Sequence, residues 1–222
     1  MIIEMIPVGP LQANCIILGC EKTKKAAVVD PGGDADRIMS VIRALGLEVV
    51  AIINTHGHAD HIAANGRVKA ATGAPIMIGE RDSGMLTSAA RNLSLLGGAY
   101  VTSPAADRLL KEGDEIEIGR VKIKVIETPG HTPGGICLLV RDMPDDGPAA
   151  DKAVNGEPRL ITGDTLFAGS VGRTDFPGGS WDELLRSIKE KLLPLGDDIE
   201  VYPGHGPATT IGDERESNPF LS

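Results

Sequence analysis

The sequence predicts an α/β (α+β) fold in which two sheets pack face to face and helices cover their outer sides. Apolar runs bounded by turn residues indicate strands, and the run Val49–Ile53 has the pattern of a strand covered on both faces. Stretches between these runs carry ordinary helix start and stop signals. Strand patterns restart after the middle of the chain, which gives two successive halves, about 1–113 and 114–222. We expect the 222 residues to form a single domain.

The first half alternates expected strands with expected helices. Its strands are expected over 1–8, 14–20, 26–30, 49–53 and 75–79. Its helices are expected over 34–45 (ending at Gly46), over 61–72 and in a helical region near 81–96. Asp30–Gly33 is expected to form the turn between the third strand and the first helix.

Short strands dominate the second half. They are expected over 115–118, 121–126, 135–141, 159–162 and 199–202. Gly119-Arg120 is a hairpin turn signal, and the stretch 142–158, rich in Pro, Gly and Asp, is expected to be a surface loop. A helix is expected over 180–193, because Ser180 is a good N-cap with Glu183 three positions later.

Charge and composition exclude several classes of function. The chain has 22 Lys and Arg against 31 Asp and Glu, a formal net charge of −9, so no nucleic-acid partner is expected. Aromatic residues make up only 3%, which argues against a base-stacking platform. The sequence shows neither a long apolar span nor a secretory pattern, so no membrane partner is expected. The 3 cysteines form no disulfide pattern, and we expect a cytoplasmic protein.

The segment His56–His61 has the residue types and the spacing of a metal site. His56 and His58 are two positions apart, so their side chains point the same way in an extended segment. Asp60 and His61 fall at the turn into the next expected helix and can face a second point. Imidazole and carboxylate groups are ligands for Zn, Fe or Mn. The two spaced imidazoles together with the Asp60-His61 pair offer more donors than one tetrahedral ion needs, which favours two ions.

Three further candidate ligands follow apolar strands, each next to glycine: His131, Asp164 and His205. Glycine lets the backbone bend tightly, and functional sites tend to be built on such loops. A lone histidine is more often a surface or core residue than a ligand. However, the chain has only 5 histidines, and all of them fall in these turn contexts. Together they predict a metal centre.

With these residues the chain resembles the metallo-β-lactamase superfamily, whose signature is HxHxDH followed by a His, an Asp and a final His. The resemblance implies a four-layer αββα sandwich with two divalent metal ions, Zn²⁺ or alternatively Fe or Mn, at one edge between the sheets. It implies two ligand groups bridged by Asp164: His56, His58 and His131 for one ion, and Asp60, His61 and His205 for the other.

Within this superfamily, the chain is most similar to short, single-domain relatives of the hydroxyacylglutathione hydrolases (glyoxalase II). The similarity is carried by the segments 163–167, 172–179, 204–212 and 214–220. It implies that Arg173 holds a glutathione carboxylate; a solvated surface arginine is the alternative. The tyrosine that those enzymes have two positions later is Asp175 here. Their C-terminal helical domain, which supplies part of the glutathione pocket, is not expected in this chain.

The resemblance implies a metal-dependent hydrolase, a thioesterase that acts on S-lactoylglutathione or a related small-molecule acyl thioester through a metal-bridging hydroxide. Asp60 and Asp164 are then catalytic residues. No GxSxG nucleophile motif is present. Asp30 either orients a ligand histidine or is an ordinary turn residue. Two alternatives share the fold: a persulfide dioxygenase with one iron held by His56, His131 and Asp164, and a lactonase.

Overall fold

Two six-stranded sheets form the centre of the computed structural model, which describes residues 1–143 and 158–221. The first sheet has the order β1-β2-β3-β4-β5-β6, with antiparallel pairs up to β3 and parallel pairs from β3 to β6. Its strands are β1 Ile2–Val8, β2 Ala13–Gly19, β3 Lys25–Val29, β4 Glu48–Asn54, β5 Ile76–Gly79 and β6 Arg108–Leu110.

The second sheet has the order β14-β13-β10-β9-β8-β7 and is antiparallel except for the β10–β13 pair. Its strands are β7 Glu115–Ile118, β8 Val121–Glu127, β9 Ile136–Asp142, β10 Arg159–Gly163, β13 Glu200–Pro203 and β14 Thr209–Thr210. A small separate ribbon is formed by β11 Leu166–Phe167 and β12 Ser170–Val171.

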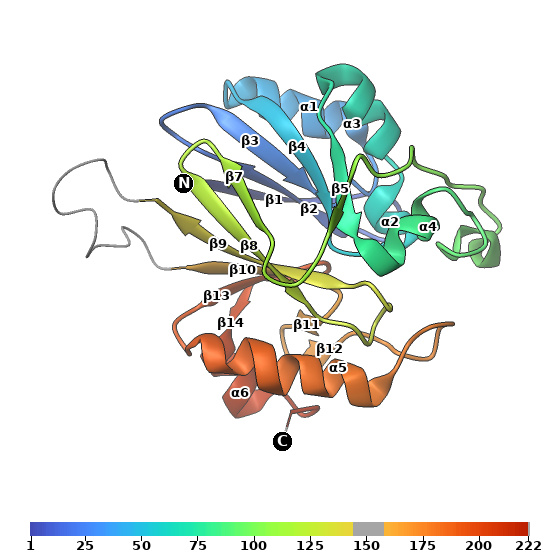
Figure 1. Cartoon of the computed structure of the whole chain (residues 1–222), viewed down its shortest axis with the longest axis vertical. Coiled ribbons are helices and arrows are strands. Elements are labelled where there is room, and N and C mark those ends of the chain that lie inside the picture. Colours follow the sequence, from blue (N-terminus) through green and yellow to red (C-terminus); the bar gives the residue numbers. More distant parts are fainter. Residues whose placement is uncertain (144–157, 222) are drawn as a thin grey trace, which may run out of the picture.

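Helices cover the outer side of each sheet. Figure 1 shows α1 and α3 on one outer face, α5 and α6 on the other, and the two sheets between them. The α-helices are α1 Ala35–Ala44, α2 Ala59–Ile62, α3 Asn65–Thr72, α4 Ser83–Leu86, α5 Trp181–Ser187 and α6 Ile211–Ser217. No helix in the described part of the chain is long and apolar enough to cross a membrane.

Three apolar cores separate the four layers. One lies between the first sheet and helices α1 and α3, one between the sheets, and one between the second sheet and helices α5 and α6. Successive residues of β4 enter different cores, since Ile52 packs under the helices and Ile53 packs between the sheets. The unbroken apolar run of β4 therefore follows from burial on both faces, and the predicted αββα sandwich is confirmed.

Several predicted elements differ from the structure. The helix expected over 61–72 is split into α2 and α3, because the Ala64 N–H bonds to the Pro31 carbonyl and not within the helix. The helical region expected near 81–96 contains only the one-turn helix α4, with a short 3-10 turn before it and another after it. There, Asn92 and Ser94 bond to nearby backbone groups and compete with helix formation. Strands β6 and β14, the ribbon β11–β12 and helix α6 were not expected.

The remaining predicted elements are found close to their expected bounds. Helix α5 begins after Ser180, whose Oγ accepts a hydrogen bond from the Glu183 N–H at 3.4 Å, as the N-cap pattern predicts. It continues as a π-helix over Ile188–Leu192 and ends in a short 3-10 helix, Leu193–Leu195, that contains a proline. The loop expected over 142–158 lies, apart from its ends, outside the described residues.

Candidate metal centre

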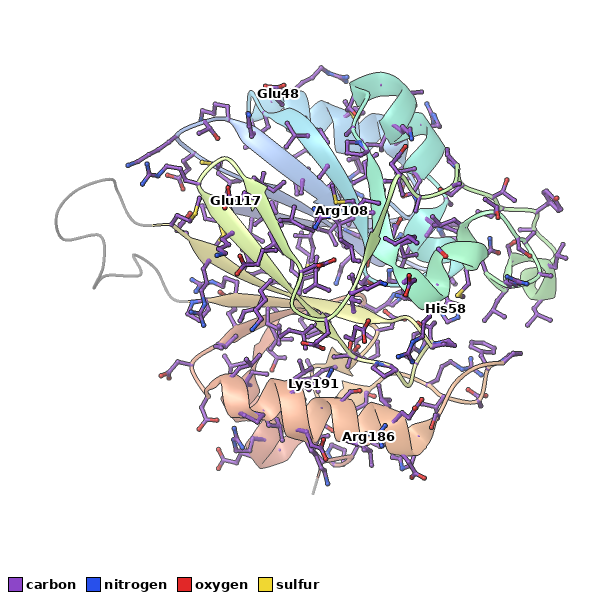
Figure 2. All side chains as sticks on the ribbon, viewed as in Figure 1. Glu48, His58, Arg108, Glu117, Arg186 and Lys191 are labelled. Carbon is purple, nitrogen blue, oxygen red and sulfur yellow. The ribbon has the colours of Figure 1, made fainter. Side chains whose placement is uncertain are left out.

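The segment from the end of β4 through α2 carries four of the candidate ligands. Strand β4 ends at Asn54, and the chain then passes through His56 and His58 before α2 begins at Ala59. Figure 2 shows His58 beside α2, at the end of the sandwich where loops connect the layers. The buried amides of Asn54 and Asn65 bond to each other, and Asn54 also donates to the His61 carbonyl. This network fixes the path of the segment.

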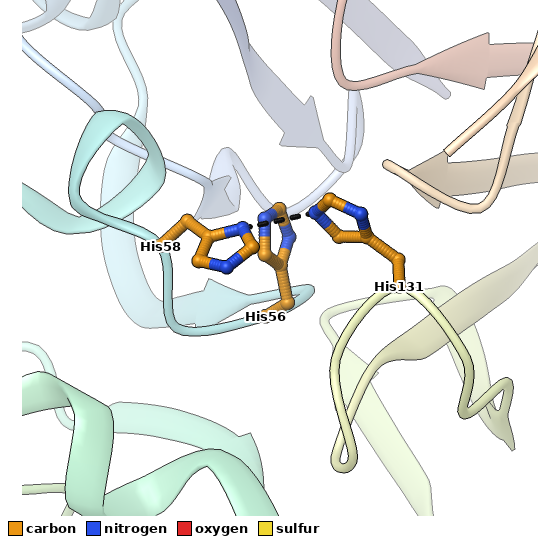
Figure 3. Close-up of side chains that lie close together, drawn as sticks. All are labelled: His56, His58 and His131. Atoms are coloured by element: carbon orange, nitrogen blue, oxygen red, sulfur yellow. Dashed lines mark hydrogen bonds between the residues drawn. The ribbon is translucent and has the colours of Figure 1, made fainter. Parts of the chain in front are cut away.

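His56, His58 and His131 form a buried cluster of imidazoles. Their ligand nitrogens all lie within 4.8 Å of one another. Figure 3 shows His56 and His58 rising from one loop while His131 reaches them from a loop on the opposite side. The dashed line joins His58 Nδ1 and His131 Nε2, which are 2.9 Å apart. Three nitrogen ligands so close together match the donor set of a zinc or iron site.

The Nδ1 atom of His56 is held by a relay through Thr55 to Asp30. Thr55 donates its hydroxyl to Asp30 Oδ2 at 2.6 Å, so its oxygen is left to accept a hydrogen bond from His56 Nδ1 at 3.1 Å. Asp30 Oδ1 accepts the Thr55 N–H at 2.7 Å. With the proton on Nδ1, His56 presents the lone pair of Nε2 to the centre.

Asp30 contacts a second candidate ligand in the same way. Its Oδ2 lies 3.0 Å from His61 Nδ1, so the Nε2 of His61 also faces the centre. Asp30 is 2% exposed and has φ 50, a left-handed backbone conformation that is unusual for a residue other than glycine. Of the two alternatives for Asp30, this geometry favours the one in which it orients histidines.

His131 is oriented by a backbone carbonyl. Its Nδ1 donates to the carbonyl oxygen of Arg173 at 2.7 Å, which leaves Nε2 facing the cluster. The side chain of Arg173 points elsewhere. It forms a two-pronged ion pair with Asp175, through distances of 2.7 and 2.6 Å, and lies 3.9 Å from the ring centroid of Phe176.

Asp60, His61 and His205 form a second group, whose ligand atoms again lie within 4.8 Å of one another. Asp60 and His61 come from α2, and His205 follows β13. His205 Nε2 lies 3.2 Å from Asp60 Oδ2. A mixed carboxylate and imidazole set suits the same metals as the first group.

Asp164 lies between the two groups. Its Oδ1 is 3.4 Å from His61 Nε2, and its Oδ2 is 3.6 Å from His131 Nε2 and 3.8 Å from His205 Nε2. The structure thus brings the seven residues predicted from the sequence to one place, with Asp164 facing members of both groups. That they bind metal stays a prediction.

The tight turns around Asp164 require glycine. Gly163 has φ 48, and a side chain there would overlap Thr55. A side chain at Gly204 would overlap the carboxylate of Asp164. The two glycines therefore let the loops after β10 and β13 approach the histidine loop closely enough to share one centre.

Three buried polar atoms in the described residues have no hydrogen-bond partner: His56 Nε2, His61 Nε2 and Asp164 Oδ1. Such atoms are costly to bury without a partner. All three point into the centre and are ligand atoms for divalent cations. The residues present therefore fit the two divalent ions that the sequence predicts. Each ligand group contains a buried histidine nitrogen that has no other partner.

The two groups differ in their titration. Burial, and then the charges of neighbouring histidines, lower the pKa of His58 to about 3 and that of His56 well below its ordinary value. Burial also acts on His61, but the carboxylates of Asp164, Asp30 and Asp60 outweigh it and raise the pKa to about 10. A hydrogen bond to Asp60 raises the pKa of His205.

The carboxyl of Asp60 stays ionised in this setting. Burial opposes its charge, but the hydrogen bond from His205 and the charge of His61 outweigh burial and hold the pKa of Asp60 well below its ordinary value. The Asp60 side chain is partly exposed to solvent. Asp60 is thus an anionic group that solvent and a ligand can reach.

Sequence reasoning missed Asp82, which ties together the loops of the first group. Asp82 is fully buried just before α4. Its Oδ2 accepts the Gly57 N–H at 3.1 Å and the Thr132 hydroxyl at 2.7 Å, and its Oδ1 accepts the Gly134 N–H at 2.7 Å. Gly57 lies between His56 and His58, and Thr132 follows His131. Asp82 is too far along the chain from both loops to give a local signal.

Asn14 has a similar position beside the second group and was also missed. Its side-chain amide donates to the carbonyls of Pro203 and Gly206, at 3.0 and 2.9 Å, and its N–H donates to the Gly204 carbonyl at 2.7 Å. These bonds hold the loop that carries His205. No residue type or spacing in the sequence marks this contact, since it joins β2 to a loop 189 residues later.

A cavity of about 930 Å³ opens above the two groups. His58, Asp60, His131, Asp164 and His205 lie on its floor, and Arg173 is part of its lining. Both predicted catalytic aspartates therefore face a space that can hold a small molecule. Arg173 borders the cavity, but its guanidinium is already paired with Asp175, and its predicted role of holding a glutathione carboxylate stays a prediction.

Comparison with known proteins links this site to one family. The family model described as the metallo-beta-lactamase superfamily matches residues 8–144 and 153–205. The chain is 38% identical to a protein of Haemophilus influenzae named hydroxyacylglutathione hydrolase GloC, over 100% of this chain and 99% of that protein. Among solved structures it is similar to BLEG-1, described as a B3 metallo-beta-lactamase, with a TM-score of 0.87, 36% identity and 100% coverage of both chains. It is also similar to TTHA1623 in a di-iron-bound form, with a TM-score of 0.80 and 32% identity over 98% of this chain and 100% of that chain.

Proposed function

Because the chain belongs to the metallo-beta-lactamase superfamily of metallo-hydrolases, we propose that it hydrolyses an acyl thioester of a small-molecule thiol. The observation that carries this proposal is the meeting of two ligand groups at Asp164 on the floor of a cavity of about 930 Å³. The name of the Haemophilus influenzae relative supports thioester chemistry, since that protein is called a hydroxyacylglutathione hydrolase.

Two divalent ions fit the centre, one in each group, with Asp164 between them; the di-iron form of TTHA1623 supports a pair of ions. Bound there, such ions supply a water whose pKa is lowered toward ~7 and polarise a carbonyl oxygen. Zn²⁺ is the ion we propose, because imidazole and carboxylate are its usual ligands in hydrolases.

Asp60 is the residue that we propose to hold the attacking water. Its carboxylate is ionised, faces the cavity and is fixed by the hydrogen bond with His205 at 3.2 Å. It accepts a hydrogen bond from the water and directs the water oxygen toward the thioester carbonyl carbon. The new C–O bond forms, the C–S bond breaks, and the products are a carboxylic acid and a thiol.

The lining of the cavity supports water as the nucleophile. Among the described residues that line it there is no cysteine, and Ser94 is the only serine or threonine. The hydroxyl of Ser94 donates to the Ala89 carbonyl and accepts the Val101 N–H, so it is engaged in holding its own loop. A thiolate is a good leaving group, and no general acid is required to release it.

Release of free thiol by protein of defined metal content tests this proposal. Chelator-treated protein is expected to release no thiol from S-lactoylglutathione or from simple acyl thioesters, and two equivalents of Zn²⁺ per chain are expected to restore release. Asp36→Asn, on an exposed residue of α1, is the control that should leave turnover unchanged. Oxygen uptake on glutathione persulfide, or opening of a lactone, without thiol release from any thioester would contradict the proposal.

A further inference from the structure

The wall of the cavity is apolar above its polar floor. Its apolar residues come from several separate loops and from β11: Leu11, Leu93, Leu96, Val101, Phe167 and Phe176. Leu11 is 67% exposed and Leu96 is 72% exposed, so large apolar side chains remain in contact with water at the cavity. Single exposed leucines are common, but a group that lines one cavity marks a surface for an apolar ligand.

The loop that supplies Leu93 and Leu96 is fixed in place beside the ligands. The Asn92 carbonyl accepts the Ala59 N–H at 3.0 Å, and Ala59 lies between His58 and Asp60. The buried Asn92 side chain accepts the Ser94 N–H and donates to the Val101 carbonyl. Hydrogen bonds therefore set the position of Leu93 and Leu96 relative to the candidate metal centre. This part of the wall is preformed.

Among the described residues that line the cavity, no lysine or arginine is left unpaired to bind a carboxylate. Arg173 is the only lysine or arginine among the described residues that line it, and Asp175 takes both prongs of its guanidinium. At neutral pH the guanidinium is protonated and the carboxyl of Asp175 is ionised, so the pair carries no net charge. The pair is exposed and modest in strength, but a ligand carboxylate would have to displace Asp175 and then lie beside its charge. The net charge of −9 also disfavours an anionic ligand.

From the apolar wall and the occupied arginine, we infer that the site takes an acyl thioester whose chains are apolar and uncharged, in preference to a glutathione thioester. Leu11, Leu93 and Leu96 of the wall contact the apolar chain. The Arg173–Asp175 pair disfavours binding of a carboxylate, because the guanidinium is already paired. This inference rests on the proposed function, since it names the substrate class of the same reaction. Asp175 and Leu96 are the residues that determine the specificity.

A chain-length series of thioesters tests the inference. The probes are acetyl, butyryl and hexanoyl thioesters of N-acetylcysteamine, an uncharged thiol, compared with S-lactoylglutathione, on protein loaded with Zn²⁺. We expect kcat/KM to rise by about threefold to fourfold for each methylene that the wall covers. Leu96→Ala should lower this gain, whereas Leu109→Ala should not, because Leu109 is an exposed leucine of β6 that does not line the cavity.

Binding of unreactive thioethers provides a readout that is independent of turnover. By calorimetry, S-hexyl-N-acetylcysteamine is expected to bind at least tenfold more tightly than S-hexylglutathione. Asp175→Ala, which frees Arg173, is expected to improve binding of S-hexylglutathione by about tenfold and to leave the uncharged thioether unchanged. Such a gain would correspond to about 1.4 kcal/mol.

The outcomes separate the inference from the function on which it rests. Tighter binding and faster turnover of the glutathione compounds by the wild type, lost in Arg173→Ala, would overturn the inference and leave the thioesterase proposal intact. Absence of thiol release from every thioester by the Zn²⁺-loaded protein would overturn both. A hexyl preference that Leu96→Ala and Leu109→Ala reduce equally would also overturn the inference, because the wall would then not be its source.

Discussion

The two ligand groups that meet at Asp164 have opposite surroundings. His56, His58 and His131 contact one another, and His56 also contacts His61, whereas His61 and His205 lie beside the carboxylates of Asp30, Asp60 and Asp164. In the metal-free chain, these surroundings favour neutral imidazoles at His56 and His58 and imidazolium at His61 and His205. His56 and His58 are therefore already in the state that binds a cation, whereas His61 and His205 must release protons first.

The largest effect is expected from the residue that faces both groups. Asp164→Ala removes the shared carboxylate, and we expect it to lower both metal content and thioester turnover. The fall in turnover should exceed the ~10–100-fold that is typical when a residue that only orients a ligand is lost. Metal analysis after dialysis, together with thiol release, measures both. Full binding of two ions by this variant would show that the groups are independent and do not share Asp164.

A smaller and selective effect is expected from Asp82, which supports only the first group. Asp82→Ala leaves the Gly57 and Gly134 N–H groups and the Thr132 hydroxyl without their buried partner. Each such loss costs about 1–3 kcal/mol and the losses are not fully additive, so we expect a loss of about 3 kcal/mol in the free energy of unfolding. Urea unfolding of the metal-free protein measures it.

Asn14→Ala is the matched variant for the second group, since Asn14 supports only the His205 loop. In competition with a chelator, Asp82→Ala should weaken one of the two metal-binding steps and Asn14→Ala the other. Equal weakening of both steps by either variant would argue against two separately supported groups.

The last contrast is a pH dependence of opposite sign for His58 and His61. His58 has a pKa of about 3 in the folded metal-free chain and ~6.5 when unfolded, so its contribution is present above ~6.5 and is lost as the pH falls toward 3. His61 has a pKa of about 10, so its contribution is present below ~6.5 and is lost as the pH rises toward 10. Each slope is at most about 1.4 kcal/mol per pH unit.

Urea unfolding of chelator-treated protein between about pH 4 and 9 tests these signs. His58→Gln should flatten the acid side of the stability profile relative to the wild type, and His61→Gln should flatten the alkaline side. If both variants keep the wild-type profile, the contrast between the surroundings of the two groups has no energetic consequence.

The layered fold and the seven candidate ligands could be predicted because each leaves a local pattern. The apolar run Val49–Ile53 signals burial on both faces, and histidines beside glycine at strand ends signal a site. Asp82 and Asn14 leave no such pattern, because their role is to bond backbone groups of loops that are distant in sequence. The break between α2 and α3 was not predicted for the same reason, since it depends on a hydrogen bond between the Ala64 N–H and the Pro31 carbonyl.

The structure also changes the reading of Arg173. The sequence predicts that its side chain binds a carboxylate, but the contact with the metal centre is made by its main-chain carbonyl, which accepts from His131. The side chain is paired with Asp175, a residue that the sequence shows to differ from the expected tyrosine but whose partner only the structure identifies. The two residues are only two positions apart, but their types alone do not show whether the guanidinium pairs with Asp175 or faces the cavity.

The carbonyl of Arg173 has a consequence for how this protein can diversify. Every amino acid supplies the same main-chain oxygen, so substitutions at this position change the cavity wall while the group that orients His131 persists. The side chain at this position can therefore vary separately from the hydrogen bond that orients His131. A substitution of Arg173 can therefore change which ligands the cavity accepts without removing the group that orients His131.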